Sequence, residues 1–214
     1  MIRFQDVRFG AIALIAAMLM GCSSDRRAPE STKAVESMRD VYASLGTAKG
    51  QVDKVTVLLD QFSHTNDLKG TLNEYTTALS DLKESAARAR ERGEDMRSRR
   101  EAYLAKWQSE AASIEDPAIK QSLETRRATV AAQFDSIRRA ADDVKAAYQP
   151  FIQDNDQIQK ALAIDLTPAG VQGIQPAMSR AKSDGNRLGQ KLDALGHELD
   201  KVMTTMTPTG KGAQ

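Results

Sequence analysis

The residues of this sequence that could perform chemistry are few: two histidines, one cysteine and a run of arginines. Di-metal sites in helical bundles use Glu-x-x-His pairs, but Gln61 precedes His64 at that spacing and Ala194 precedes His197. We therefore expect both histidines to be solvated. No Gly-rich phosphate loop or Ser/His/Asp set is evident in their place. The sequence predicts no catalytic residue, no metal site, no cofactor and no enzymatic activity.

Cys22, the single cysteine, ends an N-terminal segment with targeting features. Arg3 and Arg8 give this segment a basic start. Residues 9–20 are almost all apolar, but they are too few to span a bilayer, which needs about 20 residues. The segment ends in LMGC, which resembles the lipobox of bacterial lipoprotein precursors. That resemblance implies cleavage before Cys22 and a diacylglycerol on its sulfur. The alternative is an ordinary signal peptide followed by an incidental cysteine.

A lipid on Cys22 would anchor the protein in the cell envelope. Acyl chains contribute about 0.8 kcal/mol per buried CH₂, and a multiply acylated cysteine supplies the two signals that stable anchoring needs. Ser23 and Ser24 follow the cysteine, which by resemblance to sorting in enteric bacteria favours the outer membrane, facing the periplasm. We expect a cleaved signal peptide over 1–21, a lipidated linker over 22–31 and a loose tail over 207–214.

Six arginines fall between Arg88 and Arg100, and Tyr103 and Trp107 follow them. Such a run could be an arm that binds nucleic acid or a membrane. Cleavage of residues 1–21 would remove two of the 30 basic and one of the 29 acidic residues, which leaves 28 of each. A nucleic-acid binder is normally basic as a whole, and an exported protein does not meet cytoplasmic nucleic acid. Nucleic acid is therefore not an expected partner.

The elements that position these residues are predicted to be helices. Ala, Arg, Lys, Glu, Gln and Leu dominate, and aromatic residues make up only 5% of the chain. Apolar and small residues recur at alternating steps of three and four along the segment around the arginines, which is a heptad seam. Asp116 and Thr167 are expected N-caps before prolines, and Pro176 is expected to restart or bend the last helix. The predicted helices are 32–63, 67–114, 117–164 and 168–206.

The two central helices are predicted to pair as an antiparallel hairpin in which the numbers of facing residues sum to 230, as for Ala89 and Ala141. Two consecutive steps of four interrupt both seams at mirrored places, at 103–107–111 and at 119–123–127. The expected fold is all-α, an up-down-up-down four-helix bundle over 32–206 whose central coiled-coil hairpin projects as a two-helix tip near 100–130. Arg100, opposite Val130, and Arg127, opposite Tyr103, lie on this seam, and arginine in a seam favours a wet, weakly packed tip. The predicted core faces also include Tyr42 of the first helix and Ile119 of the third.

The arginine run lies on the flanks of this seam, because heptad numbering places its members mainly at e and g. One interpretation pairs these arginines with acids of the outer helices, namely Glu36, Asp40, Glu198 and Asp200. The other leaves residues 88–100 as a basic belt that faces anionic head groups, peptidoglycan or a partner. The candidate interaction surface comprises Arg90, Arg92, Arg97, Arg99, Arg100, Tyr103, Trp107 and Arg127.

Three stretches resemble one uncharacterised family: KWQSE at 106–110, YASLGTAKGQVDKV at 42–55 and the RR…F…IRRA…V…PFI run of the third helix. The family is known as domain of unknown function twenty-nine fifty-nine, and its members are exported, coiled-coil-rich proteins of Gram-negative bacteria. The resemblance spans about residues 35–205 and implies no catalytic residues. We expect a non-enzymatic, lipid-anchored scaffold or interaction module that contacts an unknown protein partner or itself. The alternative function is binding of anionic lipid or peptidoglycan through the basic belt.

Overall fold

The computed structural model describes residues 30–207, which are helical apart from short connections. The predicted all-α class is confirmed for this part of the chain. The predicted helix ends differ from those of the structure by no more than two residues, except where the last helix is divided. The elements are α1 (Glu30–Gln61), α2 (Leu68–Ala112), α3 (Pro117–Ile164), α4 (Pro168–Gly173) and α5 (Gln175–Met206).

Side-chain caps define the starts of three helices. Asp67 accepts a hydrogen bond from the Gly70 amide at 2.8 Å and begins α2. Asp116 accepts from two amides of the first turn of α3, at 2.8 and 3.0 Å. Thr167 accepts from the Gly170 amide at 3.1 Å and begins α4. Each cap satisfies an amide that has no partner within the helix, and contributes about 1 kcal/mol.

The predicted fourth helix is divided at Ile174 into α4 and α5. Pro176 has no amide hydrogen, so it cannot donate to the carbonyl of Gln172, as an ordinary residue of a continuous helix would. The amide of Ile174 instead bonds to the carbonyl of Val171 at 3.3 Å, which tightens the turn. The α-helical pattern resumes where the Met178 amide donates to the Ile174 carbonyl at 3.1 Å.

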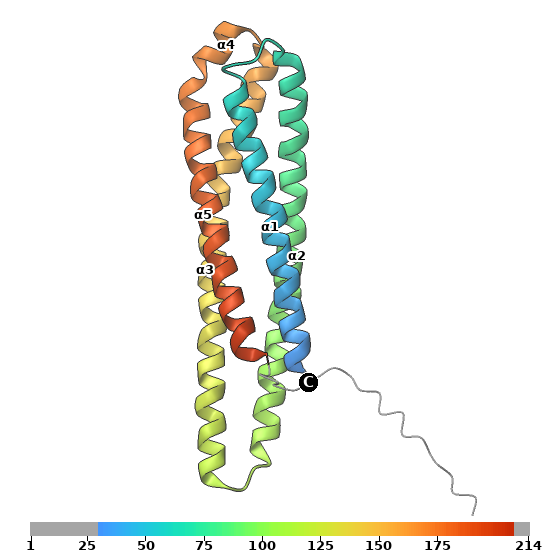
Figure 1. Ribbon diagram of the computed structural model, residues 1–214, viewed down its shortest axis with the longest axis vertical. Coiled ribbons are helices and arrows are strands. Elements are labelled where there is room, and N and C mark those ends of the chain that lie inside the picture. The colour runs from blue at the N-terminus through green and yellow to red at the C-terminus, as the bar shows by residue number, and fades with distance from the viewer. Residues whose placement is uncertain (1–29, 208–214) are drawn as a thin grey trace, which may run out of the picture.

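Four long helices lie side by side, and consecutive ones run in opposite directions (Figure 1). The short α4 crosses one end of the molecule between α3 and α5, and at the other end the α2–α3 hairpin extends beyond α1 and α5 (Figure 1). The closest packing joins α1 to α2, α3 to α5 and α1 to α5, whereas α2 and α3 contact each other more sparsely. The central hairpin is therefore held together largely through the two outer helices.

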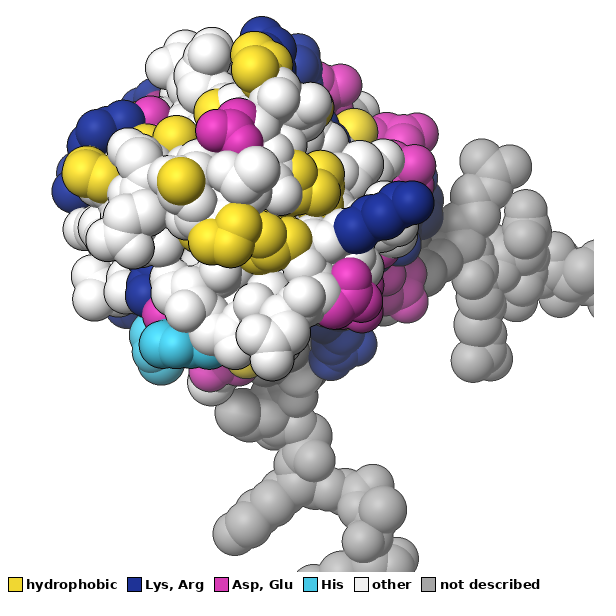
Figure 2. Space-filling view, turned by 90° about the horizontal axis from the view of Figure 1, so that it is seen from above, with side chains coloured by type: hydrophobic (Ala, Val, Ile, Leu, Met, Phe, Trp, Pro, Cys, Tyr) yellow, Lys and Arg dark blue, Asp and Glu magenta, His cyan; other side chains and the backbone are white. Residues whose placement is uncertain are grey.

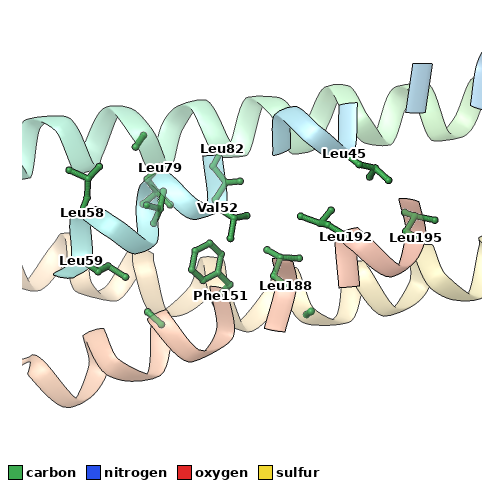
Figure 3. Packing of buried hydrophobic residues seen from close by; sticks show 14 of the residues in the cluster. Leu45, Val52, Leu58, Leu59, Leu79, Leu82, Phe151, Leu188, Leu192 and Leu195 are labelled. Atoms are coloured by element: carbon green, nitrogen blue, oxygen red, sulfur yellow. The ribbon is translucent and has the colours of Figure 1, made fainter. Parts of the chain in front are cut away.

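The core is a continuous apolar column between the four long helices. Its members include side chains with no more than 1% exposure, and each Val, Leu, Ile, Phe or Met among them contributes roughly 1.5–3 kcal/mol by burial. Figure 3 shows one side chain from each long helix converging in the middle of this column: Val52, Leu82, Phe151 and Leu188.

Three residues assigned to core faces from the sequence are exposed instead. Tyr42 is 48% exposed, because the buried stripe of α1 passes through Met38, Val41 and Leu45 and leaves Tyr42 at its edge. Ile119 is 52% exposed. It lies near the start of α3, where the hairpin has extended beyond the outer helices (Figure 1).

Ala141 is the third exposed residue, although the sum of 230 places it opposite Ala89. Because α3 packs more closely on α5 than on α2, its buried face is turned toward α5 and includes Ala147 rather than Ala141. Val130 is fully buried, with 0% exposure. The valine side of this layer is therefore fully covered, where the sequence favoured a weakly packed coil.

Candidate functional site at the hairpin end

Three of the six arginines of the basic belt are paired within their own helix. In each case the partner is an acid four residues away on α2, and both side chains are largely exposed to solvent. Such pairs contribute only a few tenths of a kcal/mol each. The nitrogen–oxygen distances are 3.3 Å for Arg88–Glu84, 3.2 Å for Arg90–Glu94 and 3.4 Å for Arg99–Asp95.

Arg92 is the belt residue whose side chain reaches α1, but its partners on α1 are a backbone carbonyl and a hydroxyl, not a carboxylate. Its Nη1 donates to the backbone carbonyl of Asp40 at 3.2 Å and to the hydroxyl of Ser44 at 3.0 Å. Arg97 makes no ion pair within residues 30–207.

The interpretation that pairs the belt with acids of the outer helices is wrong. No arginine of the belt lies within 4.0 Å of the carboxylates of the four expected partners, across the residues that the structure describes. Acids on α2 itself, one helical turn away, are nearer and take their place. The four expected partners were Glu36, Asp40, Glu198 and Asp200.

Arg100 and Arg127 lie on the hairpin seam and have different surroundings. A guanidinium nitrogen of Arg100 is 3.5 Å from Asp135, and its Cζ lies 5.8 Å from the centre of the Phe134 ring. The Nε of Arg100 is buried and has no hydrogen-bond partner among residues 30–207. Arg127 donates from two nitrogens to Glu124, at 2.9 and 2.6 Å, and this contact lowers the pKa of that carboxyl.

Tyr103 and Trp107 form an edge-to-face pair on α2, with ring centres 5.6 Å apart and planes at 76°. Both rings are half-buried. Burial raises the pKa of the Tyr103 hydroxyl, and the nearby charge of Arg126 partly opposes this. The two rings line a cavity of about 380 Å³, which we call the hairpin groove. Its walls are Glu30, Ser31, Tyr103, Lys106, Trp107, Glu110, Ala111, Ile114 and Leu123.

Glu30 brings the start of α1 to this groove. Its carboxylate accepts a hydrogen bond from Lys33 at 2.8 Å, which lowers the pKa of Glu30, and the charges of Lys106 and Arg99 on α2 act in the same direction. The end of α5 lies at the same end of the molecule, where Arg126 donates to the carbonyl of Thr205 at 2.9 Å.

The hairpin consists of α2 and α3 alone only beyond these contacts. Its two-helix end therefore covers roughly residues 108–125, because α1 reaches the level of Trp107 and α5 reaches Arg126. The sequence predicted a longer tip, near 100–130. Residues 108–125 form the two-helix end of the hairpin.

A second cavity, of about 420 Å³, lies at the opposite end of the molecule, beside α4. Figure 2 views that end, where hydrophobic side chains gather toward the middle and charged side chains lie mainly at the edge. The cavity has no Asp, Glu, His, Lys, Arg, Cys or Tyr side chain in its walls, so no acid or base lines it to activate the hydroxyls of Ser63 and Thr65. Its walls are Phe62, Ser63, Thr65, Leu68, Pro168, Val171, Gln172 and Gln175.

Both histidines are exposed, and they lie in different elements. His64 follows α1, with its Nε2 3.9 Å from Asp60, while His197 is on α5. No cluster of three or more His, Cys, Asp or Glu side chains suited to a metal ion is found in the described ranges. None of the helices from α1 to α5 is long and apolar enough to cross a membrane. Cys22, with the predicted signal peptide and linker, lies outside the described residues.

Sequence reasoning missed the buried polar residue Asn155. Its side chain lies in the core of α3 with 0% exposure and contacts Tyr75 of α2. The only available signal was its place opposite Tyr75 in the 230 register, and an apolar pattern search passes over a polar residue. No family model, curated protein or solved structure matches the chain. The resemblance to the exported coiled-coil family therefore stays a prediction.

Proposed function

We propose that this protein is a lipid-anchored, non-enzymatic interaction module of the cell envelope, held at the periplasmic face of the outer membrane. It contacts a protein partner through the two-helix end of the α2–α3 hairpin. The observation that carries the proposal is that α1 begins at Glu30 in the wall of the hairpin groove. Cys22 precedes Glu30 by eight residues, a reach of at most about 30 Å. An anchor at Cys22 would thus lie close to the two-helix end.

The composition of the two-helix end supports a role in contact. Two helices alone leave much of their apolar seam accessible to solvent, because the outer helices that cover it elsewhere are absent here. Ile119 is 52% exposed, and Ile114 and Leu123 are only partly covered. A partner helix laid along this end would bury these side chains as α1 and α5 bury the seam of the bundle.

Cys22→Ala tests the anchor in the native host. Labelling with a palmitate analogue and fractionation of the envelope measure lipidation and membrane association. The proposal expects loss of label and release from membranes for Cys22→Ala, whereas the matched variant Ser23→Ala keeps both. Label retained by Cys22→Ala would contradict the anchor.

The basic belt is a second candidate, as a binding surface for anionic lipid or peptidoglycan. Arg97 has no carboxylate partner within the described residues, and the side chain of Arg90 remains 83% exposed despite its ion pair. Exposed pairs of this kind dissociate readily, so the arginines stay available to an anionic surface. Four acids interspersed between residues 88 and 101 weaken the local positive charge.

Added salt and charge-reversal variants test whether the basic belt binds an anionic surface. Binding through the belt expects co-sedimentation with phosphatidylglycerol vesicles or peptidoglycan that weakens with added salt, because exposed charges are screened. Reversal of the belt by Arg90→Glu, Arg97→Glu and Arg99→Glu should abolish it. A control with the same change in net charge uses Lys54→Glu, Lys69→Glu and Lys160→Glu, which are exposed and lie toward the opposite end of the bundle from the belt. Equal effects of the two triple variants would leave no role for the belt itself.

A further inference from the structure

The hairpin groove lies where α1 stops and α2 continues. Along the rest of its length α1 packs closely on α2. At Glu30 this cover ends, and the groove continues along Trp107 and Ala111 of α2 to Ile114, which follows the end of that helix. Leu123 of α3 closes the opposite wall. The groove is therefore a continuation of the surface that α1 covers, and the chain that precedes Glu30 is the segment tied to its open end.

We propose that residues 25–29, with the sequence DRRAP, bind in the hairpin groove. The groove would then be an intramolecular docking site for the chain's own N-terminal linker. This proposal does not require lipid on Cys22.

The chemistry of the segment matches that of the groove. Ala28 and Pro29 are small and apolar, and proline packs well on aromatic rings such as those of Tyr103 and Trp107, as in grooves that bind proline-rich peptides. The preset backbone of proline lowers the entropy lost on docking.

The charges of residues 25–29 and of the groove favour the same placement of this segment. Arg26 and Arg27 would lie farther along α2 than Pro29, toward Glu110 and the turn that carries Glu115. Glu110 is only weakly held, since Lys106 is 3.8 Å away and the Glu110 side chain is 70% exposed. An arginine can form a stronger, bidentate contact with a carboxylate than a lysine can.

The length of the segment is also sufficient. From Tyr103 to Ala111 the groove follows α2 for about 12 Å, at 1.5 Å per residue, and Ile114 lies just beyond the end of the helix. Residues 22–29 extend for up to about 26 Å, at roughly 3.3 Å per residue. A docked segment would thus bring Cys22 to the far end of the hairpin. If the proposed lipid anchor is correct, the two-helix end then points toward the membrane, a consequence that rests on the proposed function.

Disulfide trapping tests the docking in the unlipidated chain that begins at residue 22, with Cys22→Ser. Cysteines replace Ala28 and either Ala111, which lines the groove, or its neighbour Ala112, which is exposed and does not. A loose tether samples both positions at similar effective concentration. Docking expects an intramolecular disulfide that forms at least about tenfold faster with position 111 than with position 112. Equal rates would overturn the proposal.

Trp107, the only tryptophan, gives a second readout without new cysteines. Removal of residues 22–29, or the pair Arg26→Glu and Arg27→Glu, should shift its emission to longer wavelength and increase quenching by acrylamide. Three results would overturn the proposal: no change on removal, a change that depends on protein concentration and so indicates a second copy, or protection only when lipid vesicles are added. Because both readouts use unlipidated protein, failure of the lipid anchor would not affect them.

Discussion

The hydroxyl oxygen of Tyr75 lies 2.8 Å from the side-chain oxygen of Asn155 and joins α2 to α3 in the core. Both residues have 0% exposure. The amide nitrogen of Asn155 donates in turn to the carbonyl of Phe151 at 2.6 Å. The numbers 75 and 155 sum to 230. This pair therefore provides a polar, directional contact between two helices that otherwise pack sparsely on each other.

Tyr75→Phe should lower the free energy of unfolding by about 1–3 kcal/mol, because it leaves the buried oxygen of Asn155 without a donor. Urea denaturation followed by circular dichroism measures this change. Tyr148→Phe is the matched control, since Tyr148 is a half-buried tyrosine on α3 for which the structure gives no hydrogen bond from the hydroxyl. Equal losses for the two variants would show that the contact with Asn155 contributes nothing specific.

Alkaline pH should destabilise the fold through the same tyrosine. Burial, and secondarily the charge of Asp156, raises the pKa of Tyr75 well above its ordinary value of 10.0. The unfolded chain therefore loses this proton first. Stability from this group is complete below about pH 10 and falls by about 1.4 kcal/mol per pH unit above it.

The pH effect is checked by urea denaturation at several values between about pH 9 and 11. Tyr75→Phe should reduce the slope of the free energy of unfolding against pH by up to about 1.4 kcal/mol per pH unit, which corresponds to one proton. Burial also raises the pKa values of Tyr103 and Tyr148, so some slope should remain in the variant. An unchanged slope in Tyr75→Phe would contradict the assignment.

Two glycines of α5 should respond in opposite ways to alanine. A Cβ at Gly185 would lie 2.6 Å from the hydroxyl of Thr56 and 3.0 Å from the ring of Phe151, so the close contact of α5 with α1 and α3 would have to open. Strain of this kind in a packed core costs typically about 1–3 kcal/mol. A Cβ at Gly189 meets nothing within 4 Å.

Gly189→Ala should therefore stabilise the protein by up to about 1 kcal/mol, through the higher helix propensity of alanine. Gly185→Ala should be destabilising despite the same gain in propensity. Thermal unfolding of both variants measures the difference. The packing described for α5 would be refuted if Gly185→Ala proved as stable as Gly189→Ala.

The helices and their caps were predictable from the sequence because their signals are local. A heptad seam, an Asp or Thr before a proline and a proline inside a helix act within one or two turns, as Asp116, Thr167 and Pro176 illustrate. Tyr42 and Ala141 were misplaced because the orientation of a helix depends on which neighbours it packs against, and the outer helices cover α2 and α3 more closely than these two cover each other.

The candidate site was harder to predict, because arginine partners depend on side-chain reach. The predicted helix lengths place Asp40 of the first helix beside the arginine run, and Asp40 does lie next to Arg92. The backbone carbonyl of Asp40, not its carboxylate, accepts the hydrogen bond from Arg92. The groove itself depends on where α1 ends relative to Trp107, and a shift of two residues in the helix start changes what lines it. Heptad spacing does not fix that level.

The claim that the two-helix end is the contact surface is tested most directly by photo-cross-linking in living cells. A photoreactive amino acid replaces Gln108, which is exposed at that end, or Gln190, which is exposed on α5 along the side of the molecule. If the two-helix end is the contact surface, we expect a discrete adduct from position 108 that is absent from position 190. The adduct should have twice the mass of the chain if the partner is a second copy. An adduct from position 190 alone, or the same adducts from both positions, would contradict it.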